Sequence, residues 1–199
     1  MAKRGIFIVI EGIDGSGKDT HLKFIASNLR ERGYNVLETA EPSRQSVGTF
    51  LKKYAKRKEA RLPAETEALL YAADRFEHVK KVIEPALARG YIVISIRYLY
   101  SSIAYQGAAG VELSWIKEIN RFALKPDLAV LLDILPEYSL HRLKRKRSIY
   151  ESADYLRKVR DIYVQLAKEG ELVTVDADRP KKVVQTELLS LIEELVEDK

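Results

Sequence analysis

The sequence predicts a three-layer α/β/α fold built on a five-stranded parallel sheet with helices on both faces. The first observation is a set of short apolar runs, of which Ile6–Ile10 and Leu128–Asp133 are the clearest, and strands covered on both faces have this pattern. The second is that segments with helical spacing of apolar residues separate these runs, as in repeated β-α units. The third is a glycine-rich segment, Gly12–Gly17, directly after the first run, where parallel α/β sheets bind ligands.

Each element follows from a local pattern. The expected strands are, in chain order, 6–10, 35–39, 91–96, 128–133 and 172–175. The expected buried stripes of three helices are Leu22, Ile25 and Leu29, then Leu69, Ala72, Phe76, Val79 and Ile83, and finally Val184, Leu188, Leu191 and Leu195. The middle helix should end near Arg89 and Gly90, because a basic residue followed by glycine is typical of a helix C-terminus.

Residues 1–199 are expected to form a single domain, since no linker rich in serine, glycine or proline divides the chain. The first apolar run is too short for a signal peptide, and no run approaches membrane-spanning length. We therefore expect a cytoplasmic protein without membrane contact. The absence of cysteine excludes disulfides and thiolate metal sites.

The net charge of +5 favours an anionic partner, either a small phosphorylated substrate or a nucleic acid. Basic residues gather in one short segment, which carries Arg142, Lys144, Arg145, Lys146 and Arg147. A single local cluster is more typical of a phosphate clamp than of a nucleic-acid track. We expect no nucleic-acid partner.

The segment Glu11–Thr20, EGIDGSGKDT, is interpreted as a phosphate-binding loop. Gly12, four further residues, Gly17 and Lys18 fit the pattern GxxxxGK[ST], in which backbone N–H groups surround phosphates and the lysine reaches the outer two. The strand before it and the helix after it supply the required context. These features predict nucleotide binding and a fold of the P-loop NTPase type. The expected nucleotide-binding residues here are Gly12, Ile13, Asp14, Gly15, Ser16, Gly17, Lys18, Asp19 and Thr20.

Polar residues at the carboxyl ends of the expected strands are further candidates, because ligands of open α/β sheets bind there. They are the turn Glu41–Arg44, Arg97 with Tyr98, and Asp133. Any one residue at a strand end is often structural, but their convergence at one edge of the sheet favours a shared site.

Five ordered blocks resemble the thymidylate kinase family over nearly the whole chain. They are EGIDGSGK, AADRFEHVKKVIEPAL, RYLYSSIAYQG, PDLAVLLD and DADRP. The resemblance implies transfer of the ATP γ-phosphoryl group to dTMP, a step of dTTP biosynthesis, with Mg²⁺ as cofactor. It also implies a homodimer.

The same resemblance assigns residues to the acceptor. Asp14 would contact the sugar 3′-hydroxyl, although a role in ordering the loop would also explain it. Arg44 resembles the arginine that holds the acceptor phosphate. Arg75 resembles the arginine that reads the thymine edge, and the alternative is an ordinary amphipathic helix, which fits a buried arginine poorly. Tyr105 matches a position where a bulky ring disfavours a ribose 2′-hydroxyl. The implied acceptor set is Asp14, Arg44, Phe50, Tyr71, Arg75, Arg97, Ser102, Tyr105 and Gln106.

Arg97 resembles the catalytic arginine that bridges the donor and acceptor phosphates. A small basic lid is expected at about 141–151, where five cations lie within seven residues and repel one another unless an anion neutralises them. A solvated helix face would account for some of these charges, and the spacing leaves open which arginine points inward. The implied catalytic set is Lys18, Arg97, Arg142, Arg145 and Arg147, and DADRP implies that Asp178 and Arg179 lie near the adenine of ATP.

Two residues depart from the family pattern near the expected metal. Asp19 replaces the usual hydroxyl residue, and Ile96 replaces an aspartate after the third strand. We hypothesise that the carboxylate has moved across the site and that Asp19 ligates Mg²⁺. Without a cation, a carboxylate about 4 Å from a phosphate charge is repelled by roughly 4 kcal/mol at an effective dielectric of about 20. The alternative is that Asp19 stabilises the first turn of its helix. Asp133 is either a second metal-side carboxylate or a partner of loop backbone.

The sequence therefore predicts an enzyme of this family that transfers the phosphoryl group in line, without a covalent intermediate. A kinase of another nucleotide or nucleoside is one alternative. A nucleotide-binding regulatory protein with weak catalysis is another, against which the presence of Lys18 and Arg97 argues.

Overall fold

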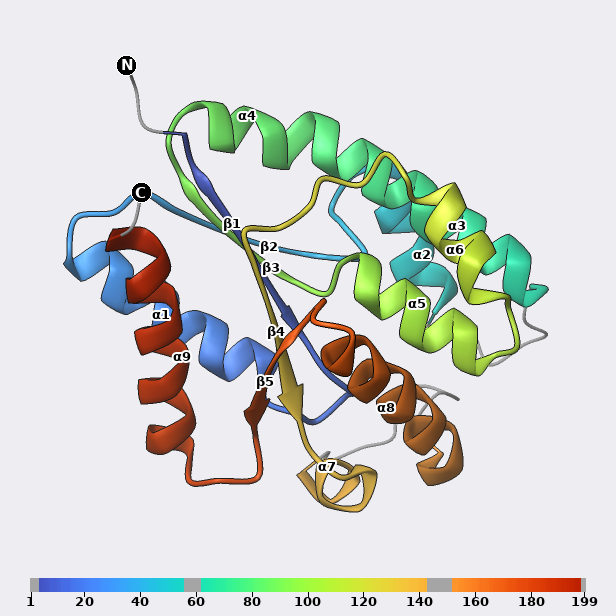
Figure 1. Ribbon diagram of the computed structural model, residues 1–199. Coiled ribbons are helices and arrows are strands. Elements are labelled where there is room, and N and C mark those ends of the chain that lie inside the picture. The colour runs from blue at the N-terminus through green and yellow to red at the C-terminus, as the bar shows by residue number, and fades with distance from the viewer. Residues whose placement is uncertain (1–3, 56–61, 143–151, 198–199) are drawn as a thin grey trace.

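The computed structural model describes residues 4–55, 62–142 and 152–197 (Figure 1). Five strands form one sheet in the order β2-β3-β1-β4-β5, and every pairing is parallel. The predicted five-stranded parallel sheet is confirmed, and no strand end differs from its expected position by more than one residue. The strands are β1 (Ile6–Glu11), β2 (Val36–Ala40), β3 (Ile92–Ile96), β4 (Leu128–Asp133) and β5 (Val173–Asp176).

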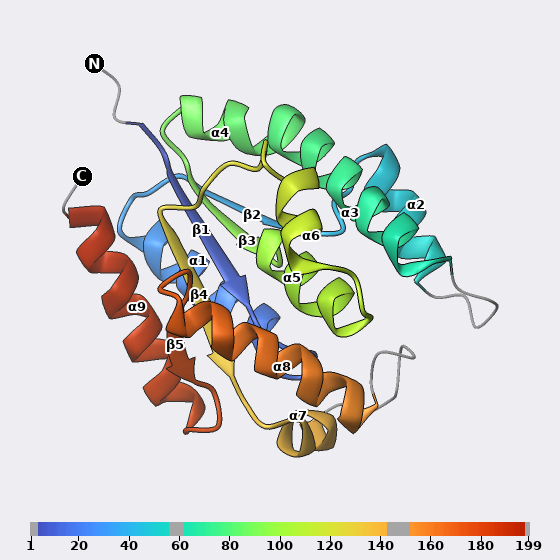
Figure 2. The ribbon, with the colours of Figure 1, turned by 45° about the vertical axis from the view of Figure 1, so that its right-hand side comes forward.

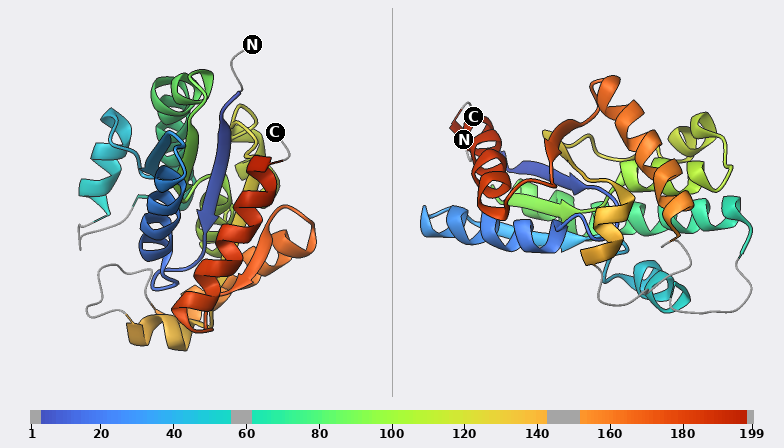
Figure 3. Two further views of the ribbon diagram at one scale, coloured as in Figure 1. Left: turned by 90° about the vertical axis from the view of Figure 1, so that its left-hand side faces the viewer. Right: turned by 90° about the horizontal axis from the view of Figure 1, so that it is seen from below.

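Helices cover both faces of this sheet, which confirms the predicted three layers (Figures 1 and 3). α1 and α9 pack together on one face, while α4, α5 and α8 lie on the other, as right-handed crossovers between parallel strands require. The helices are α1 (Lys18–Glu31), α2 (Ser46–Tyr54), α3 (Ala64–His78), the π-helical turn η1 (Val79–Ile83), α4 (Glu84–Ala88), α5 (Leu99–Ala108), α6 (Leu113–Ile119), α7 (Pro136–Arg142), α8 (Ala153–Lys168) and α9 (Lys181–Glu197).

The long middle helix is confirmed, but part of its expected buried stripe is wrong. α3, η1 and α4 follow one another without a break and end at Arg89 and Gly90, as predicted. Leu69 and Phe76 are 50% and 48% exposed, so they do not face the core. The buried face of α3 instead carries small and polar residues, Ala68, Ala72 and Arg75 among them.

The register of the central strands brings the functional segments together. β1 and β3 are buried along their whole length, and Ile10 pairs with Ile96 at their carboxyl ends. The N–H of Arg97 then donates to the carbonyl of Ile10 at 3.0 Å. This places the end of β3 beside the phosphate-binding loop.

Helices α5 and α8 lie side by side over the same face of the sheet (Figure 2). α8 begins after the segment 143–151, which holds most of the predicted lid and lies outside the described residues. Across the part of the chain that the structure describes, no helix is both long and apolar enough to cross a bilayer.

Candidate active site

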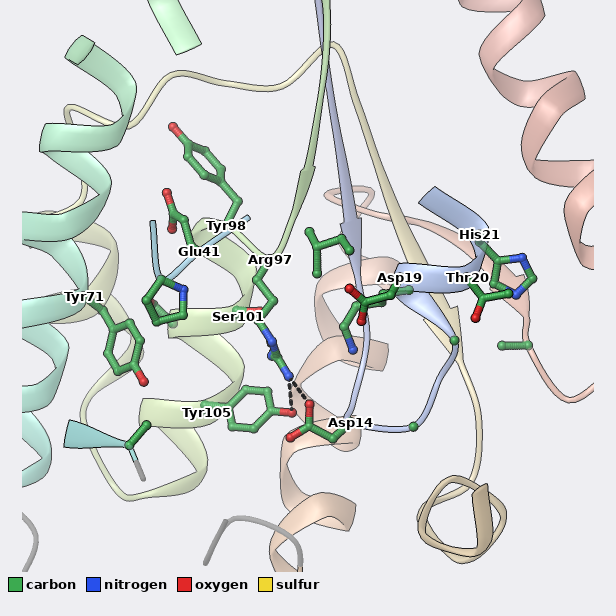
Figure 4. Close-up of a pocket in the computed structure, with 18 of the residues that line it drawn as sticks. Asp14, Asp19, Thr20, His21, Glu41, Tyr71, Arg97, Tyr98, Ser101 and Tyr105 are labelled. Atoms are coloured by element: carbon green, nitrogen blue, oxygen red, sulfur yellow. Dashed lines mark hydrogen bonds and ion pairs between the residues drawn. The ribbon is translucent and has the colours of Figure 1, made fainter. Parts of the chain in front are cut away.

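A cavity of about 960 Å³ opens at the carboxyl edge of the sheet. Tyr71 lies at one end of it and Thr20 and His21 lie at the other, with Arg97 between the two ends (Figure 4). The predicted site residues that line the cavity are Asp14, Gly15, Gly17, Lys18, Asp19, Thr20, Tyr71, Arg75, Arg97, Ser102, Tyr105, Gln106, Arg142 and Arg179.

The phosphate-binding loop folds around the side chain of Lys18. The Lys18 ammonium donates hydrogen bonds to the carbonyls of Gly12 (2.9 Å) and Ile13 (2.8 Å) and to Ser16 Oγ (3.4 Å). Burial lowers the pKa of Lys18 to about 7, and the charge of Arg97 adds to this effect. Because the charged form of Lys18 is poorly hydrated there, an anion bound in the loop would stabilise that form.

Gly15 allows the phosphate-binding loop to touch the helix that leads into the predicted lid. Its φ of +84° lies in the left-handed region, and a Cβ there would lie 2.3 Å from the carbonyl oxygen of Ser139 on α7. Any side chain at this position would separate the loop from α7. The loop and the base of the predicted lid are therefore in direct contact.

Arg97 is held in the middle of the cavity. Its Nη2 donates to Asp14 Oδ1 at 2.6 Å and to the Tyr105 hydroxyl at 3.1 Å, and its Nη1 donates to Ser101 Oγ at 3.2 Å. The guanidinium carbon also lies 4.7 Å from the centre of the Tyr105 ring. Burial raises the pKa of Tyr105 to about 12, so it remains a neutral phenol at neutral pH. The structure therefore joins three predicted site residues, Asp14, Arg97 and Tyr105, in one network.

Arg75 is buried at the end of the cavity where Tyr71 lies, with 1% of its surface exposed. Its Nη1 donates to Asn120 Oδ1 at 2.6 Å, and its Nη2 lies 2.8 Å from Glu41 Oε2 and donates to Ser102 Oγ at 3.0 Å. Arg75 therefore lines the cavity and, through Glu41, also holds the turn after β2 in place. Glu41 Oε1 lies 3.1 Å from the Nδ1 of His78, a second α3 residue in the same network.

The turn Glu41–Arg44, named the acceptor turn here, is fixed by Asp74 of α3. Asp74 Oδ2 accepts from the N–H of Ser43 at 2.7 Å, and Oδ1 accepts from Ser43 Oγ at 2.5 Å. Arg44 is exposed and is not among the residues lining the cavity, whereas Lys52 of α2 is. Burial and then the charge of Arg44 lower the pKa of Lys52, so two cations lie near each other at this end.

The other predicted acceptor residues divide into two groups. Tyr71, Ser102 and Gln106 line the cavity, and the last two are buried. Phe50 lies outside the cavity lining: it is 45% exposed on α2 and stacks on Tyr54 with ring centres 6.2 Å apart. The structure therefore brings together most of this set but leaves Phe50 on the surface.

The opposite end of the cavity, where Thr20 and His21 lie, combines α7 with the turn between β5 and α9. Arg142 Nη1 donates to the carbonyl of Ala177 at 3.1 Å, and its Nη2 donates to Asp178 Oδ1 at 3.2 Å. Arg179 lines the cavity and pairs with Glu187 of α9. Arg142 thus lies against the DADRP segment. The other two predicted lid arginines, Arg145 and Arg147, lie outside the described residues.

Asp19 and Ile96, the two departures from the family pattern, both line the cavity. Asp19 is exposed in the first turn of α1, whereas Ile96 is 6% exposed at the end of β3. Both carboxylate oxygens of Asp133 accept hydrogen bonds from Arg160 of α8, at 2.7 and 2.8 Å, a partner that neither expectation named. In the described ranges, no three histidine, cysteine, aspartate or glutamate side chains cluster as a metal site.

The sequence reasoning missed several residues that line the cavity, Lys52, His21, Ser101 and Lys181 among them, and also the buried carboxylate of Glu11. Lys52 is hidden in an ordinary amphipathic helix, and His21 in α1 is 5% exposed with a buried Nδ1 that has no hydrogen-bond partner among the described residues. Glu11 ends the apolar run of β1 and is fully buried. A charged residue at the end of a buried strand is the signal that would have identified Glu11.

Comparison with known proteins gives a consistent result. Residues 10–188 match the family model described as thymidylate kinase. A probable thymidylate kinase of Pyrococcus abyssi is 44% identical over 197 residues, which cover 95% of this chain and 96% of the relative. Those of Pyrococcus horikoshii and Pyrobaculum aerophilum are 42% and 43% identical, and the alignments cover 95% and 96% of this chain and 96% and 97% of the relatives.

Proposed function

Because this chain belongs to the thymidylate kinase family, we propose that it transfers the γ-phosphoryl group of ATP to dTMP, forming dTDP and ADP. The observation that carries the proposal is the position of Arg97 between the two ends of the cavity. One end offers the phosphate-binding loop and the other offers an aromatic and polar pocket. Two phosphate-bearing ligands that enter from opposite ends would meet at this guanidinium.

The donor phosphates bind to the loop amides and Lys18. The helix N-terminus of α1 adds its partial positive charge. When ATP binds, the lysine exchanges contacts with loop carbonyls for contacts with phosphate oxygens. Arg142 and Arg179 lie on the adenine side, where their existing partners fix their position. The donor is thereby oriented with its terminal phosphate toward Arg97.

The acceptor lies between Tyr71, Arg75 and the α5 side chains. Arg44 and Lys52 supply positive charge near the dTMP phosphate, and the acceptor turn that carries Arg44 is held by Asp74. The Tyr105 ring, fixed against Arg97, limits room beside the sugar and favours a deoxyribose. Arg97 then stabilises the charge on the phosphoryl group as it moves in line from donor to acceptor. The acceptor phosphate is already ionised, so no side chain has to remove a proton.

Asp19 is the proposed Mg²⁺ ligand. One exposed carboxylate beside a phosphate-binding loop fits this ion, which is usually held by one or two carboxylates, substrate phosphates and water. Bound there, Mg²⁺ would neutralise charge on the donor phosphates. Asp19 would contribute one oxygen, and its negative charge would then be an advantage instead of a source of repulsion.

A substrate panel tests the proposed function. Purified protein with ATP and Mg²⁺ is offered dTMP, dUMP, dCMP, dGMP or UMP, and formation of ADP is followed, with Lys18→Ala and no-acceptor controls. Selective turnover of dTMP supports the proposal. Turnover of a different acceptor would support phosphoryl transfer but reject the residues assigned to the thymine base. ATP binding without acceptor-dependent formation of ADP would reject kinase activity.

The active form is proposed to be a homodimer. Phe76 and Phe122 pack with ring centres 4.9 Å apart, yet both are at least 36% exposed, and Leu69 lies two helical turns from Phe76 on the same face of α3. A second copy of the chain would cover this apolar surface. Light scattering should give twice the chain mass, and Phe76→Glu should give a monomer. A wild-type monomer would reject the dimer.

We also expect a cytoplasmic location, which cell fractionation tests.

A further inference from the structure

Glu11, the last residue of β1, is a buried carboxylate that the proposed reaction does not use. Its exposed fraction is 0%. Burial raises the pKa of Glu11, because the charged form loses its hydration. A buried charge is unfavourable unless it is well paired, so the contacts of this side chain indicate its role.

Four hydrogen bonds converge on the Glu11 carboxylate. Oε1 accepts from the N–H groups of Tyr98 (2.8 Å) and Ser101 (3.1 Å). Oε2 accepts from Ser101 Oγ (2.6 Å) and from the Tyr163 hydroxyl (2.8 Å). Tyr98 precedes α5 and Ser101 lies in its first turn, where N–H groups lack the usual α-helical partner four residues back; the Ser101 N–H also donates to the Tyr98 carbonyl at 3.2 Å. Glu11 therefore caps α5 from a neighbouring strand.

Arg97, the residue directly before this cap, has an unusual backbone. Its φ of 63° lies in the left-handed region, which non-glycine residues rarely adopt. Such a conformation persists only where surrounding contacts enforce it. The Arg97 N–H donates to the Ile10 carbonyl, and Ser95 Oγ donates to the Arg97 carbonyl at 2.9 Å. Glu11 adds the next contact along the chain by binding the N–H of Tyr98.

Ser101 extends the same contact to the Arg97 side chain. Its Oγ donates to Glu11 Oε2 and accepts from Arg97 Nη1 at 3.2 Å. One carboxylate therefore fixes both the backbone turn and, through Ser101, one edge of the guanidinium. Figure 4 shows Ser101 beside Arg97 on the wall of the cavity.

We propose that Glu11 is a positioning residue for phosphoryl transfer, which holds the Arg97 guanidinium between the donor and acceptor phosphates. The inference rests on the proposed function. Tyr163 of α8 also donates a hydrogen bond to the Glu11 carboxylate, and this contact connects α8 to the turn that carries Arg97. Glu11 itself does not touch either substrate, and its effect on the reaction passes through Arg97.

The test is a double-mutant cycle between Glu11 and Arg97. Glu11→Gln keeps the shape of the side chain but replaces one carboxylate oxygen with an NH₂ group. That group would face N–H or O–H groups that donate to Glu11 in the wild type. We expect kcat to fall about 10- to 100-fold, with KM for ATP and dTMP changed less than about threefold. In an Arg97→Ala background the same change should alter kcat less than about twofold. Equal losses in both backgrounds, a loss confined to KM, or no loss would overturn the proposal.

Tyr163→Phe is a second, milder variant, which removes the contacts of the Tyr163 hydroxyl with Glu11 Oε2 (2.8 Å) and Ser101 Oγ (2.9 Å) and keeps the Glu11 carboxyl group. It should lower kcat by about 3- to 10-fold, and that loss should also vanish in the Arg97→Ala background. Tyr100→Phe is the matched control, since this buried tyrosine of α5 bonds Glu171 instead. Its kcat should match wild type. An equal loss in Tyr100→Phe would overturn the proposal.

Crystal structures of wild type and Glu11→Gln separate this inference from the proposed function. If the wild type forms no dTDP, the proposed function is rejected. If the turn that carries Arg97 is nevertheless displaced in Glu11→Gln, Glu11 still holds that turn in place. An active wild type, with full kcat in Glu11→Gln, would reject the positioning role alone.

Discussion

Binding of ATP is expected to return a proton to Lys18. In the protein without nucleotide, burial lowers the pKa of Lys18 to about 7, and the charge of Arg97 acts in the same direction. A phosphate oxygen beside the amine favours its charged form and raises its pKa. Above pH 7 the protein should therefore take up a proton at Lys18 when ATP binds.

The size of this uptake follows from the pKa. With a value of about 7, roughly 90% of Lys18 is neutral at pH 8 and roughly 10% at pH 6, so uptake should be about 0.9 and about 0.1 proton. ATP affinity should fall up to about tenfold per pH unit above pH 7. The stability of the unliganded protein should change in the opposite direction. Its lysine pKa lies below the ordinary 10.5, the unfolded state binds more protons, and this group adds stability as pH rises between the two values.

Calorimetric titration with ATP and Mg²⁺, in pairs of buffers that differ in ionisation enthalpy, measures the uptake at pH 8 and pH 6. Lys18→Arg is the matched control, because arginine stays protonated throughout this range. Equal uptake at both pH values, or uptake that persists unchanged in Lys18→Arg, would show that Lys18 is not the group that gains the proton.

Other side chains give separate tests. Asp19→Ser should weaken Mg²⁺ use in a kinase assay and Ile96→Asp should partly restore it, and additive losses would reject a relocated carboxylate. Asp74→Ala removes two buried hydrogen bonds to the acceptor turn; urea unfolding should show a loss of about 2–4 kcal/mol, and initial rates a higher KM for dTMP. An unchanged KM for dTMP would show that the acceptor turn does not contribute to dTMP binding. Asp133→Asn should cost about 1 kcal/mol through Arg160 and leave Mg²⁺ dependence unchanged, whereas a shifted requirement would make Asp133 a metal-side residue.

The sheet was predictable because the sequences of its central strands show directly that these strands are buried. β1 and β4 are covered on both faces, so their sequences are apolar without alternation, and each passes directly into polar residues at the ligand edge. The exposed positions of Leu69 and Phe76 were not predictable in the same way. Their spacing fits a buried stripe, but α3 packs through small residues on another face.

The candidate site was predictable where one residue acts through a local motif. Lys18 and Gly15 belong to such a motif, and Arg97 follows a strand whose register with β1 is fixed by pairing. Contacts between distant segments were not predictable from spacing. Arg75 was assigned a base contact, yet its ion pair joins it to Glu41, and the four donors around Glu11 come from segments far along the chain.

In the proposed reaction, the γ-phosphoryl group passes directly from ATP to dTMP beside Arg97. A single-turnover experiment with γ-labelled ATP, Mg²⁺, dTMP and excess protein, quenched over time, measures this most directly. All label that leaves ATP should appear in dTDP at each time, with none on the protein, and Arg97→Ala should slow the transfer without changing the product. Label that accumulates as inorganic phosphate or on the protein before dTDP forms would rule out direct transfer.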